Sequence, residues 1–542
     1  MKKILFFAIA WFIIFAANAQ PFFLLSRSSD PQYRINSFIF HDDLTFFFEP
    51  YAIASDDTES LKQSSRARHS MSYLSYFNRN RTNPISKNKW VQKITDHELI
   101  QFVDTDYCIQ VYPLVDFSAG QSSLKDNRLS QNTRGFWLSG ATRKFGFTTT
   151  FAENQSYLPS FLDSFRTVSG TLPGQGPVKN FKVGGYDYAY ATGELAYKAA
   201  HNVRLAFGNE RQFIGDGYRS LILSDFCSPY PYFKAEWKMG PIQYRYQIAQ
   251  MHDRTVPSNV KPLPTKYHAF HYLDWKVTPK WKIGVYDAIV WARVSPFNGT
   301  IRGIDWNYLN PFVFFRPLEY NNRSVDNAFL ALNTSYNITS RVQTYGQLFL
   351  DEFRLSDWRK KNQSWTQKFG IQAGVKGFVN FKNNRNLFGL LEYNVVRPFT
   401  YSHQYPVQNY SHANAPLAHP LGANFHELLG QIQLTQNRFQ TNLWFSNSVR
   451  GNDTSSASLG GNIFKNYNLR AADEGNFLTQ GNAQNITHLR FSMAYIVNQG
   501  NNLRVELTYG SRTAQSPTQA PVTENYWSFG IKTAIFYRPS DF

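Results

Sequence analysis

Charged residues gather around two glycines in one polar stretch of the sequence, and they are Glu210, Arg211, Arg219 and Asp225. Gly215 and Gly217 allow positive φ angles, so the chain can turn sharply there. An arginine guanidinium donates paired hydrogen bonds to a carboxylate, which makes a folded-in loop of this composition a candidate site for sugar hydroxyls or carboxylates. The alternative is a network of internal ion pairs that stiffens the protein, and these residue types favour that alternative.

Two further polar stretches carry the same residue types. One runs from Tyr308-Leu309-Asn310-Pro311 to Arg316 and Glu319, and the other begins at Arg397-Pro398-Phe399. Both interpretations, ligand site or ion-pair network, apply to these residues too. The candidate ligand-binding set therefore comprises the four residues above together with Arg316, Glu319 and Arg397.

Acidic residues elsewhere in the sequence invite a comparison with glycosidases. Asp351, Glu352 and Glu392 could form such a pair only if two carboxylates lay about 5–10 Å apart on either side of a sugar. Balancing the charge of the many arginines is the simpler role for them. The sequence contains no Ser-His-Asp pattern, phosphate-binding loop or zinc-binding helix motif. We expect no enzymatic activity and no cofactor.

Four histidines share one region: His403, His412, His419 and His426. A metal site would need them to converge, and neither a cysteine nor a close pair of histidines supports one. Ordinary loop histidines are favoured, and we expect no metal. The two cysteines, Cys108 and Cys227, have no metal-ligand spacing either, and two separate buried thiols are favoured over a disulfide bridge.

The elements that position these residues are predicted to be β-strands. Apolar and aromatic residues occupy alternate positions in the last part of the chain: Trp527, Phe529, Ile531, Thr533, Ile535 and Tyr537. A period of two places these side chains on one face of a sheet. We expect the chain to end on this strand, with Phe542 as its last residue, as in a bacterial outer-membrane β-barrel.

Paired strands joined by short turns recur along the sequence. Predicted hairpins are 135–141 with 145–153, 186–197 with 203–208, 233–239 with 243–251, 271–277 with 281–291, 428–434 with 439–445, and 489–497 with 503–509. Longer polar segments, such as 154–185, 254–268 and 396–426, separate them. This asymmetry is typical of an all-β transmembrane barrel, with short periplasmic turns and long extracellular loops. Its length predicts roughly 16–20 antiparallel strands around a polar lumen.

Single strands indicate which side chains face the lipid. Arg504 and Glu506 alternate with apolar residues, and a basic residue on the lipid face costs roughly 2–4 kcal/mol at the bilayer midplane. We therefore expect both to point inward, where they could form a pair. The same reasoning predicts that Gln440, Asn442 and Ser446 point inward. It predicts that Phe439, Thr441, Leu443 and Phe445 point outward.

The beginning of the chain has the features of an export signal. Lys2 and Lys3 precede a short apolar run, and Ala17-Asn18-Ala19 supplies small residues for cleavage. We expect a signal peptide at residues 1–19, a partly helical periplasmic segment at 20–99, and the barrel at 100–542. The helical expectation rests on the capping residues near Ser55 and on residues 67–76 and 89–99.

Composition agrees with an exported barrel more than with a soluble protein. Mean hydropathy is −0.42, but aromatic residues make up 17% of the sequence, and barrels concentrate aromatics in girdles at both membrane surfaces. Tyr188, Tyr190, Trp291 and Trp306 could stack on sugars, although girdle positions are expected for most aromatics. The net charge of +18 points to anionic surroundings. Lipopolysaccharide phosphates are the favoured partner, an acidic polysaccharide the alternative, and nucleic acid is not expected.

The polar stretches also carry a resemblance. Phe207-Gly208-Asn209-Glu210-Arg211 with Gly215-Asp216-Gly217-Tyr218-Arg219-Ser220, Phe315-Arg316-Pro317-Leu318-Glu319, and Leu417-Ala418-His419-Pro420-Leu421-Gly422 together resemble the Wzi-like capsule-assembly family of outer-membrane barrels. They look most like the branch of gliding Bacteroidota described as gliding motility protein RemB. The resemblance covers most of the chain from about Trp90.

The resemblance implies a non-enzymatic outer-membrane protein that binds or organises surface polysaccharide, with the candidate set as its ligand-binding residues. A gliding-motility accessory that works through motility or secretion machinery is the alternative. A porin or an outer-membrane glycan hydrolase is the third possibility.

Overall fold

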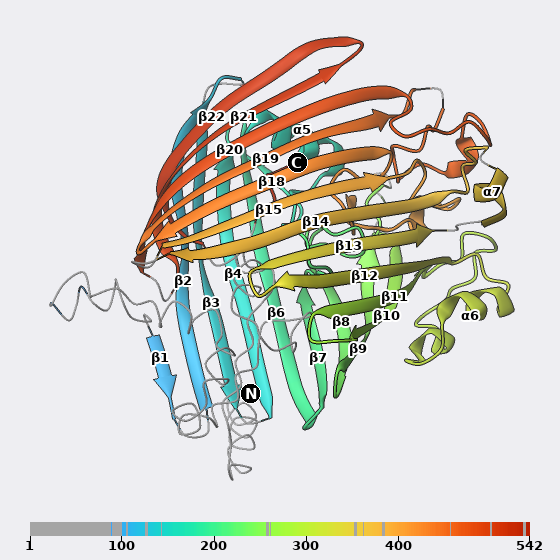
Figure 1. Ribbon diagram of the computed structural model, residues 1–542, viewed down its shortest axis with the longest axis horizontal. Helices are drawn as coiled ribbons and strands as arrows, with labels where there is room; N and C mark the ends of the chain where they lie inside the picture. The colour runs from blue at the N-terminus through green and yellow to red at the C-terminus, as the bar shows by residue number, and fades with distance from the viewer. Residues whose placement is uncertain are drawn as a thin grey trace.

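The computed structural model shows one antiparallel sheet closed into a barrel (Figure 1). The structure describes residues 88, 91, 100–104, 107–124, 128–142, 144–255, 260, 262–351, 355–360, 362–381, 385–455, 457–498, 501–534 and 538–542. The expected signal peptide and the expected helices before Leu99 lie outside these residues, apart from Asn88 and Val91. Among the described residues, no helix is both long and apolar enough to span a bilayer.

Most strands have 10–17 residues. They are β1 (Ile100–Val103), β2 (Tyr107–Ser122), β3 (Leu129–Thr142), β4 (Phe145–Tyr157), β5 (Lys179–Phe181), β6 (Gly185–Ala200), β7 (Val203–Glu210), β8 (Tyr230–Met239), β9 (Ile242–His252), β10 (Thr265–Lys276), β11 (Trp281–Ala292), β12 (Asn327–Thr339), β13 (Val342–Asp351), β14 (Lys368–Phe381), β15 (Arg385–Val396), β16 (Ser411–His412), β17 (Ala415–Pro416), β18 (Phe425–Gln436), β19 (Phe439–Asn452), β20 (Asn482–Asn498), β21 (Leu503–Ser516) and β22 (Gln519–Thr533). The helices are short: α5 (Ser160–Ser169), η4 (Trp306–Leu309), α6 (Phe315–Asn321), α7 (Leu355–Lys360), η5 (Pro406–Gln408) and η6 (Tyr467–Leu469).

In the part of the chain that the structure describes, 20 strands form the large sheet, and 18 of them make the closed ring once the short β1 and β5 are set aside. Successive strands are neighbours, and β22 pairs with β2 to close the wall. The expected barrel of 16–20 strands is confirmed, and all six expected hairpins are present. Gly240, at φ 57°, makes the tight turn between β8 and β9.

Long and short connections lie at opposite ends of the barrel. Short turns join β3 to β4, β6 to β7, β8 to β9 and the later pairs, whereas residues 158–184, 211–229, 293–326, 397–424 and 453–481 make long connections at the other end. Outer-membrane barrels have their short turns in the periplasm and their long loops outside the cell. The start of β2 and the end of β22 share the short-turn end.

The expected division of side chains between lipid and lumen is confirmed. Phe439 is 62% exposed and Leu443 39% exposed on the outer face, while Ser446 is buried. Inside, Arg504 Nε lies 3.5 Å from Glu506 Oε2, which is the expected inward pair. An apolar outer face around a polar interior is what a lipid solvent requires of a closed sheet.

Two long connections fold into the lumen instead of covering its mouth. An apolar core is built on the inner faces of β8–β13. Residues 211–229 and 397–424 contribute to it the fully buried side chains of Leu221, Ile222, Tyr401 and Tyr410. We refer to these two segments as the plug. The plug fills the lumen beside β8–β13.

Charged groups of the wall anchor the tip of the first plug segment. Lys282 Nζ lies 2.8 Å from Asp216 Oδ1, and Asn333 donates a 2.8 Å hydrogen bond to Oδ2. Burial alone would raise the pKa of Asp216, but Lys282 and Lys376 outweigh burial and hold that pKa below its ordinary value. The Asp216 carboxylate is therefore ionised, and Lys282 and Asn333 hold it in place.

The end of the chain differs from expectation. β22 ends at Thr533, so the expectation that the last strand runs to Phe542 is wrong. Residues 538–542 turn into the lumen, where the Phe542 ring packs edge-on against three rings, those of Phe161, Phe165 and Phe226. Inside the barrel this ring packs, partly buried, against an apolar cluster. Figure 1 marks the C-terminus within the barrel.

The wall beside β2 is completed by two different strands. β22 pairs with residues 116–122 of β2, and β1 pairs with residues 108–111. Pro113 has no N–H to donate to a ladder, and it lies in the interval between the two pairings. β1 thus follows β22 along the same edge of β2.

Candidate functional site

Three of the candidate residues, Glu210, Arg211 and Asp225, form one group on the wall of the lumen. Glu210 Oε1 accepts hydrogen bonds from the Arg211 backbone N–H at 2.8 Å and from the Tyr190 hydroxyl at 3.1 Å. Arg211 is 1% exposed and donates to the Asp225 carbonyl oxygen at 2.9 Å. These contacts tie both ends of the first plug segment to β6, so they support the ion-pair alternative.

Arg219 belongs to a second group, at the meeting point of the plug, β18 and the C-terminal residues. Its guanidinium lies 3.3 Å from Glu427 Oε1 and 3.4 Å from Asp541 Oδ2. His419 Nε2 lies 2.7 Å from the other oxygen of Glu427. Burial lowers the pKa of His419, although Glu427 opposes that change.

The remaining candidates lie elsewhere. Arg397 donates to the Asn476 carbonyl oxygen at 3.0 Å, linking two long connections. Arg316 and Glu319 pair with each other at 2.9 Å on α6, and the Arg316 side chain is 55% exposed. The seven candidates therefore occupy separate places in the structure.

The carboxylates considered as a glycosidase pair have protein partners. Glu392 is 1% exposed and accepts from the Tyr218 backbone N–H at 2.7 Å and the Tyr345 hydroxyl at 2.8 Å. Asp351 lies 3.3 Å from Lys368 Nζ, and Glu352 lies outside the described residues. Within the described ranges, no group of three His, Cys, Asp or Glu side chains could hold a metal ion.

Cys227 is a free thiol in the plug. Burial raises its pKa to about 12, so the thiol is protonated at neutral pH. This bears out the view of Cys227 as a small buried side chain.

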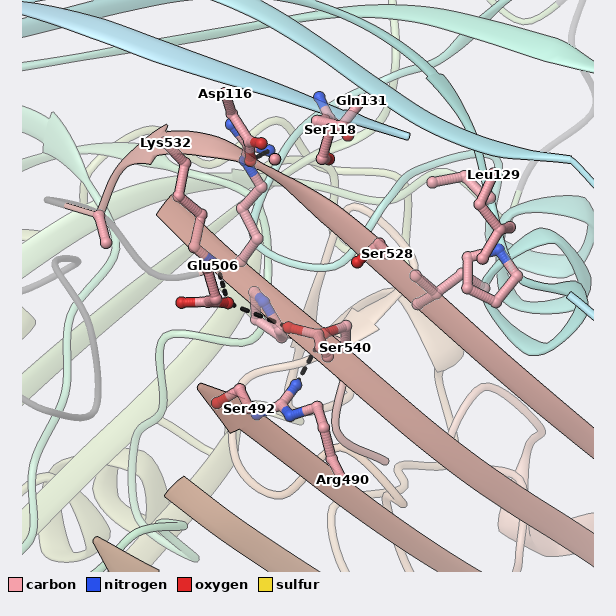
Figure 2. Close-up of a pocket in the computed structure, with 18 of the residues that line it drawn as sticks. Asp116, Ser118, Leu129, Gln131, Arg490, Ser492, Glu506, Ser528, Lys532 and Ser540 are labelled. Atoms are coloured by element: carbon pink, nitrogen blue, oxygen red, sulfur yellow. Dashed lines mark hydrogen bonds and ion pairs between the residues drawn. The ribbon is translucent and has the colours of Figure 1, made fainter. Parts of the chain in front are cut away.

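A cavity of about 360 Å³ occupies the part of the lumen that the plug leaves open (Figure 2). The inner faces of β2, β3 and β18–β22 line it, together with the segment around α5 and residues 538–540. It extends from Phe161 and Leu162 on α5 to Gln440 and Arg504 at the short-turn ends of their strands. Pockets that hold small ligands have about 300–1,000 Å³.

Ionic groups face the cavity from several strands. Lys532 Nζ lies 2.5 Å from Glu506 Oε1, and Figure 2 shows this pair across from Arg490. Arg490 donates to Ser540 Oγ at 3.1 Å. With Arg504 and Arg538 the lining has four cations against two carboxylates, Asp116 and Glu506, a formal charge of +2.

Amide side chains face the same cavity. Gln175 is 3% exposed, and neither polar atom of its side chain has a hydrogen-bond partner among the described residues. Gln431 donates to Asn442 at 2.6 Å, but its Oε1 likewise has no partner there. Because an unpaired buried polar group is costly, these amides are suited to hydrogen bonds with a hydroxyl-rich ligand.

One carboxylate holds α5 over the cavity. Glu524, on β22, accepts from the Ser160 backbone N–H at 2.9 Å and from Ser122 Oγ at 2.6 Å. A negative charge at a helix N-terminus satisfies free N–H groups and interacts favourably with the helix dipole. Glu524 thereby fixes α5 to the wall.

Replacing Glu524 with alanine is expected to release α5. Loss of a charged hydrogen-bond acceptor costs about 1.5–3 kcal/mol locally, so limited proteolysis should cut residues 160–169 faster than in the wild type. Glu474→Ala, at an exposed position, is the matched control and should leave cleavage there unchanged. Equal cleavage rates in both variants would contradict the role given to Glu524.

Sequence reasoning did not identify the cavity as a site. Its lining residues come from strands hundreds of positions apart, and only the inward orientation of Gln440, Asn442, Arg504 and Glu506 was predicted. Of the aromatic candidates for sugar stacking, Tyr188 lines the cavity. Trp291 is fully buried and Trp306 is 85% exposed, and neither lines it.

No family model matches the sequence, and no curated protein does. Among solved structures, the barrel is similar to Wzi, an outer-membrane protein involved in group 1 capsule assembly in Escherichia coli and described as a carbohydrate-binding β-barrel. The TM-score is 0.54 at 13% identity, over 94% of this chain and 99% of that one. The fold is Wzi-like. The outer-membrane protein OprD from Pseudomonas aeruginosa gives a TM-score of 0.42 at 11% identity, over 82% and 98% of the two chains.

The Wzi-like barrel fold and the apolar outer face together locate the protein. An even-numbered antiparallel barrel with lipid-facing apolar side chains and a polar interior is the architecture of outer-membrane proteins. The protein lies in the outer membrane.

Proposed function

We propose that this barrel is a non-enzymatic binding protein for surface polysaccharide and that its lumen cavity holds a short saccharide segment. The observation that carries the proposal is the cavity itself, where buried amide atoms of Gln175 and Gln431 have no partner among the described residues and lie next to a surplus of cations. Hydroxyl-rich ligands satisfy amides, and a formal charge of +2 favours an acidic saccharide. The carbohydrate binding described for Wzi agrees with this assignment.

The candidate residues named from sequence have a supporting role in this proposal. Arg211, Arg219 and Asp225 are occupied by contacts within the protein, so they hold the plug in place and thereby shape the cavity. Ligand contacts are assigned instead to Arg490, Gln175 and Gln431.

Replacing Arg490 with glutamine is expected to weaken binding of the organism's own surface polysaccharide. Loss of one charge-assisted hydrogen bond costs about 1.5–3 kcal/mol, which corresponds to roughly 10–100-fold in Kd. Purified protein in detergent and calorimetric titration with polysaccharide fragments provide the measurement. Arg341→Gln, in an exposed short turn, is the control and should bind like the wild type. An Arg490 variant with unchanged affinity would show that the polysaccharide does not bind in the cavity.

Deletion of the gene separates polysaccharide binding from the gliding-motility role suggested by the RemB-like resemblance. A strain that loses surface polysaccharide supports the first. A strain that keeps its polysaccharide but spreads poorly over surfaces supports an accessory acting through motility or secretion machinery.

Conductance separates binding from the porin alternative. The plug fills the lumen along β8–β13, which favours a binding protein over an open channel. Planar bilayers containing the purified barrel should therefore show little ion conductance. Steady conductance would favour a porin, and release of sugars from the polysaccharide would favour a hydrolase.

A further inference from the structure

One long connection lies against the outside of the barrel. Even-numbered residues of β11 face inward, because Lys282 reaches Asp216 in the plug; odd-numbered residues, including Asp287 and Trp291, therefore face outward. Residues 293–326, which we name the outer arm, pack on this outward face. Figure 1 shows α6, part of the outer arm, to one side of the strands and outside the barrel.

The outer arm is joined to the wall by specific contacts. Tyr308 and Phe315 are fully buried against outward residues such as Tyr246 and Trp291. The Tyr246 hydroxyl donates to the Tyr308 carbonyl oxygen at 2.9 Å. The Phe315 backbone N–H donates to Asp287 at 2.8 Å. The arm is thus a fixed part of the outer surface.

The outer arm extends over most of the height of the wall. Asp287, which meets the start of α6, lies near the middle of β11. Phe312 stacks on Tyr244 with ring centroids 6.0 Å apart, and Tyr244 lies two residues from the short turn that precedes β9. The arm therefore reaches from the long-loop end to the depth of the membrane-spanning part of β8–β11.

Its other side is apolar, and no other part of the chain that the structure describes covers it. Exposed fractions are 72% for Phe297, 74% for Ile301, 85% for Trp306, 75% for Phe312, 57% for Phe314 and 82% for Tyr320. An aromatic side chain can bury about 150–250 Å², so the exposed parts of the five aromatic side chains offer roughly 550–950 Å². A specific interface buries about 800 Å² per partner.

Bare lipid is a poor cover for this surface. The outer arm is largely irregular in backbone, and irregular segments at membrane depth occur where protein covers them. Arg316, 55% exposed on α6, would face hydrocarbon at a cost of roughly 2–4 kcal/mol near the midplane. A protein surface with its own aromatic groups fits better.

We propose that the outer arm is a dimerisation surface and that the arm of a second copy of this chain covers it. Its area matches one side of a standard interface, and the Arg316 guanidinium is already paired with Glu319 on α6, so the patch carries no uncompensated charge. In a two-fold pair the same patch meets itself, so the aromatic rings of the two copies pack between the barrels.

Cysteine cross-linking in native outer membranes tests the dimer. In a Cys108→Ser, Cys227→Ser background, single cysteines replace Ile301, Trp306 or Tyr320, and membranes are treated with a short bismaleimide. The expected product has twice the mass of the chain. Val168→Cys, 88% exposed on α5, is the control and should stay monomeric. Arm cysteines that give only monomer, or only products with another protein, would overturn the proposal.

A charge exchange provides the second measurement. Arg316→Glu should abolish the cross-linked dimer, because α6 of each copy then presents two adjacent carboxylates to those of the other. Adding Glu319→Arg restores an opposite-charge pair within α6, and the dimer should return. If the Arg316→Glu, Glu319→Arg variant stays monomeric while the single-cysteine variants with the original charges still cross-link, the two-fold pairing is wrong. Light scattering in mild detergent gives the masses independently.

Discussion

Replacing Arg219 with alanine is expected to lower the free energy of unfolding by about 3–5 kcal/mol, because two carboxylates would then remain buried without their cation. Glu427 is 1% exposed and Asp541 is fully buried, and both face the guanidinium. Removing one partner of a buried pair costs more than the pair contributes when intact. Urea unfolding of the barrel in lipid vesicles, followed by tryptophan fluorescence, measures the change.

Two variants calibrate the Arg219 experiment. Arg341→Ala removes an exposed arginine from a short turn and should change stability by no more than about 0.5 kcal/mol. Arg219→Lys keeps the positive charge but loses the planar guanidinium that can bind two carboxylates. Its loss in free energy of unfolding is expected to lie between those of the other two variants. An Arg219→Ala loss no larger than that of the Arg341 variant would show that the buried network contributes little.

Acid is expected to destabilise the folded protein through His412, which lies in the plug and is 4% exposed. Burial, and next the positive charge of Lys266, lower the pKa of His412 to about 3 from an ordinary value near 6.5. Between these values the unfolded chain binds a proton that the folded protein does not. This contribution is present above pH 6.5 and decreases by about 1.4 kcal/mol per pH unit as the pH falls towards 3.

His412→Asn isolates this contribution. Asparagine cannot titrate, but its side-chain oxygen can replace Nδ1 as acceptor for the His252 backbone N–H, which lies at 3.2 Å. Unfolding free energies at pH 7, 6, 5 and 4 should decline more steeply for the wild type than for the variant. Parallel pH curves would show that His412 titrates normally in the folded protein.

The wall of the barrel could be predicted from sequence because its causes are local. A period of two places alternate side chains on opposite faces, and a charge placed in lipid is costly, so the inward pair of Arg504 and Glu506 follows from a few neighbouring residues. The turn at Gly240 is equally local. These features need no knowledge of distant parts of the chain.

The contents of the lumen could not be predicted in the same way. Asp216 finds Lys282 and Lys376 far along the chain, and nothing near Asp216 indicates that its loop folds inward. Arg316 and Arg219 have similar sequence surroundings, yet one lies outside the barrel and the other in its interior. Phe542 has the pattern of a strand end, but its ring packs inside the barrel against Phe161, Phe165 and Phe226, which lie hundreds of residues away in the sequence.

The shared edge of β2 has a consequence for biogenesis. Folding machinery must keep β2 available until the last hairpin has been delivered, since β22 seals only part of that edge and β1 seals another. Residues 538–542 have to be threaded inward at the same stage. Sealing of the wall and packing of the interior are therefore one late step, and a nascent barrel stalled before it would expose both an unpaired strand and an empty hollow.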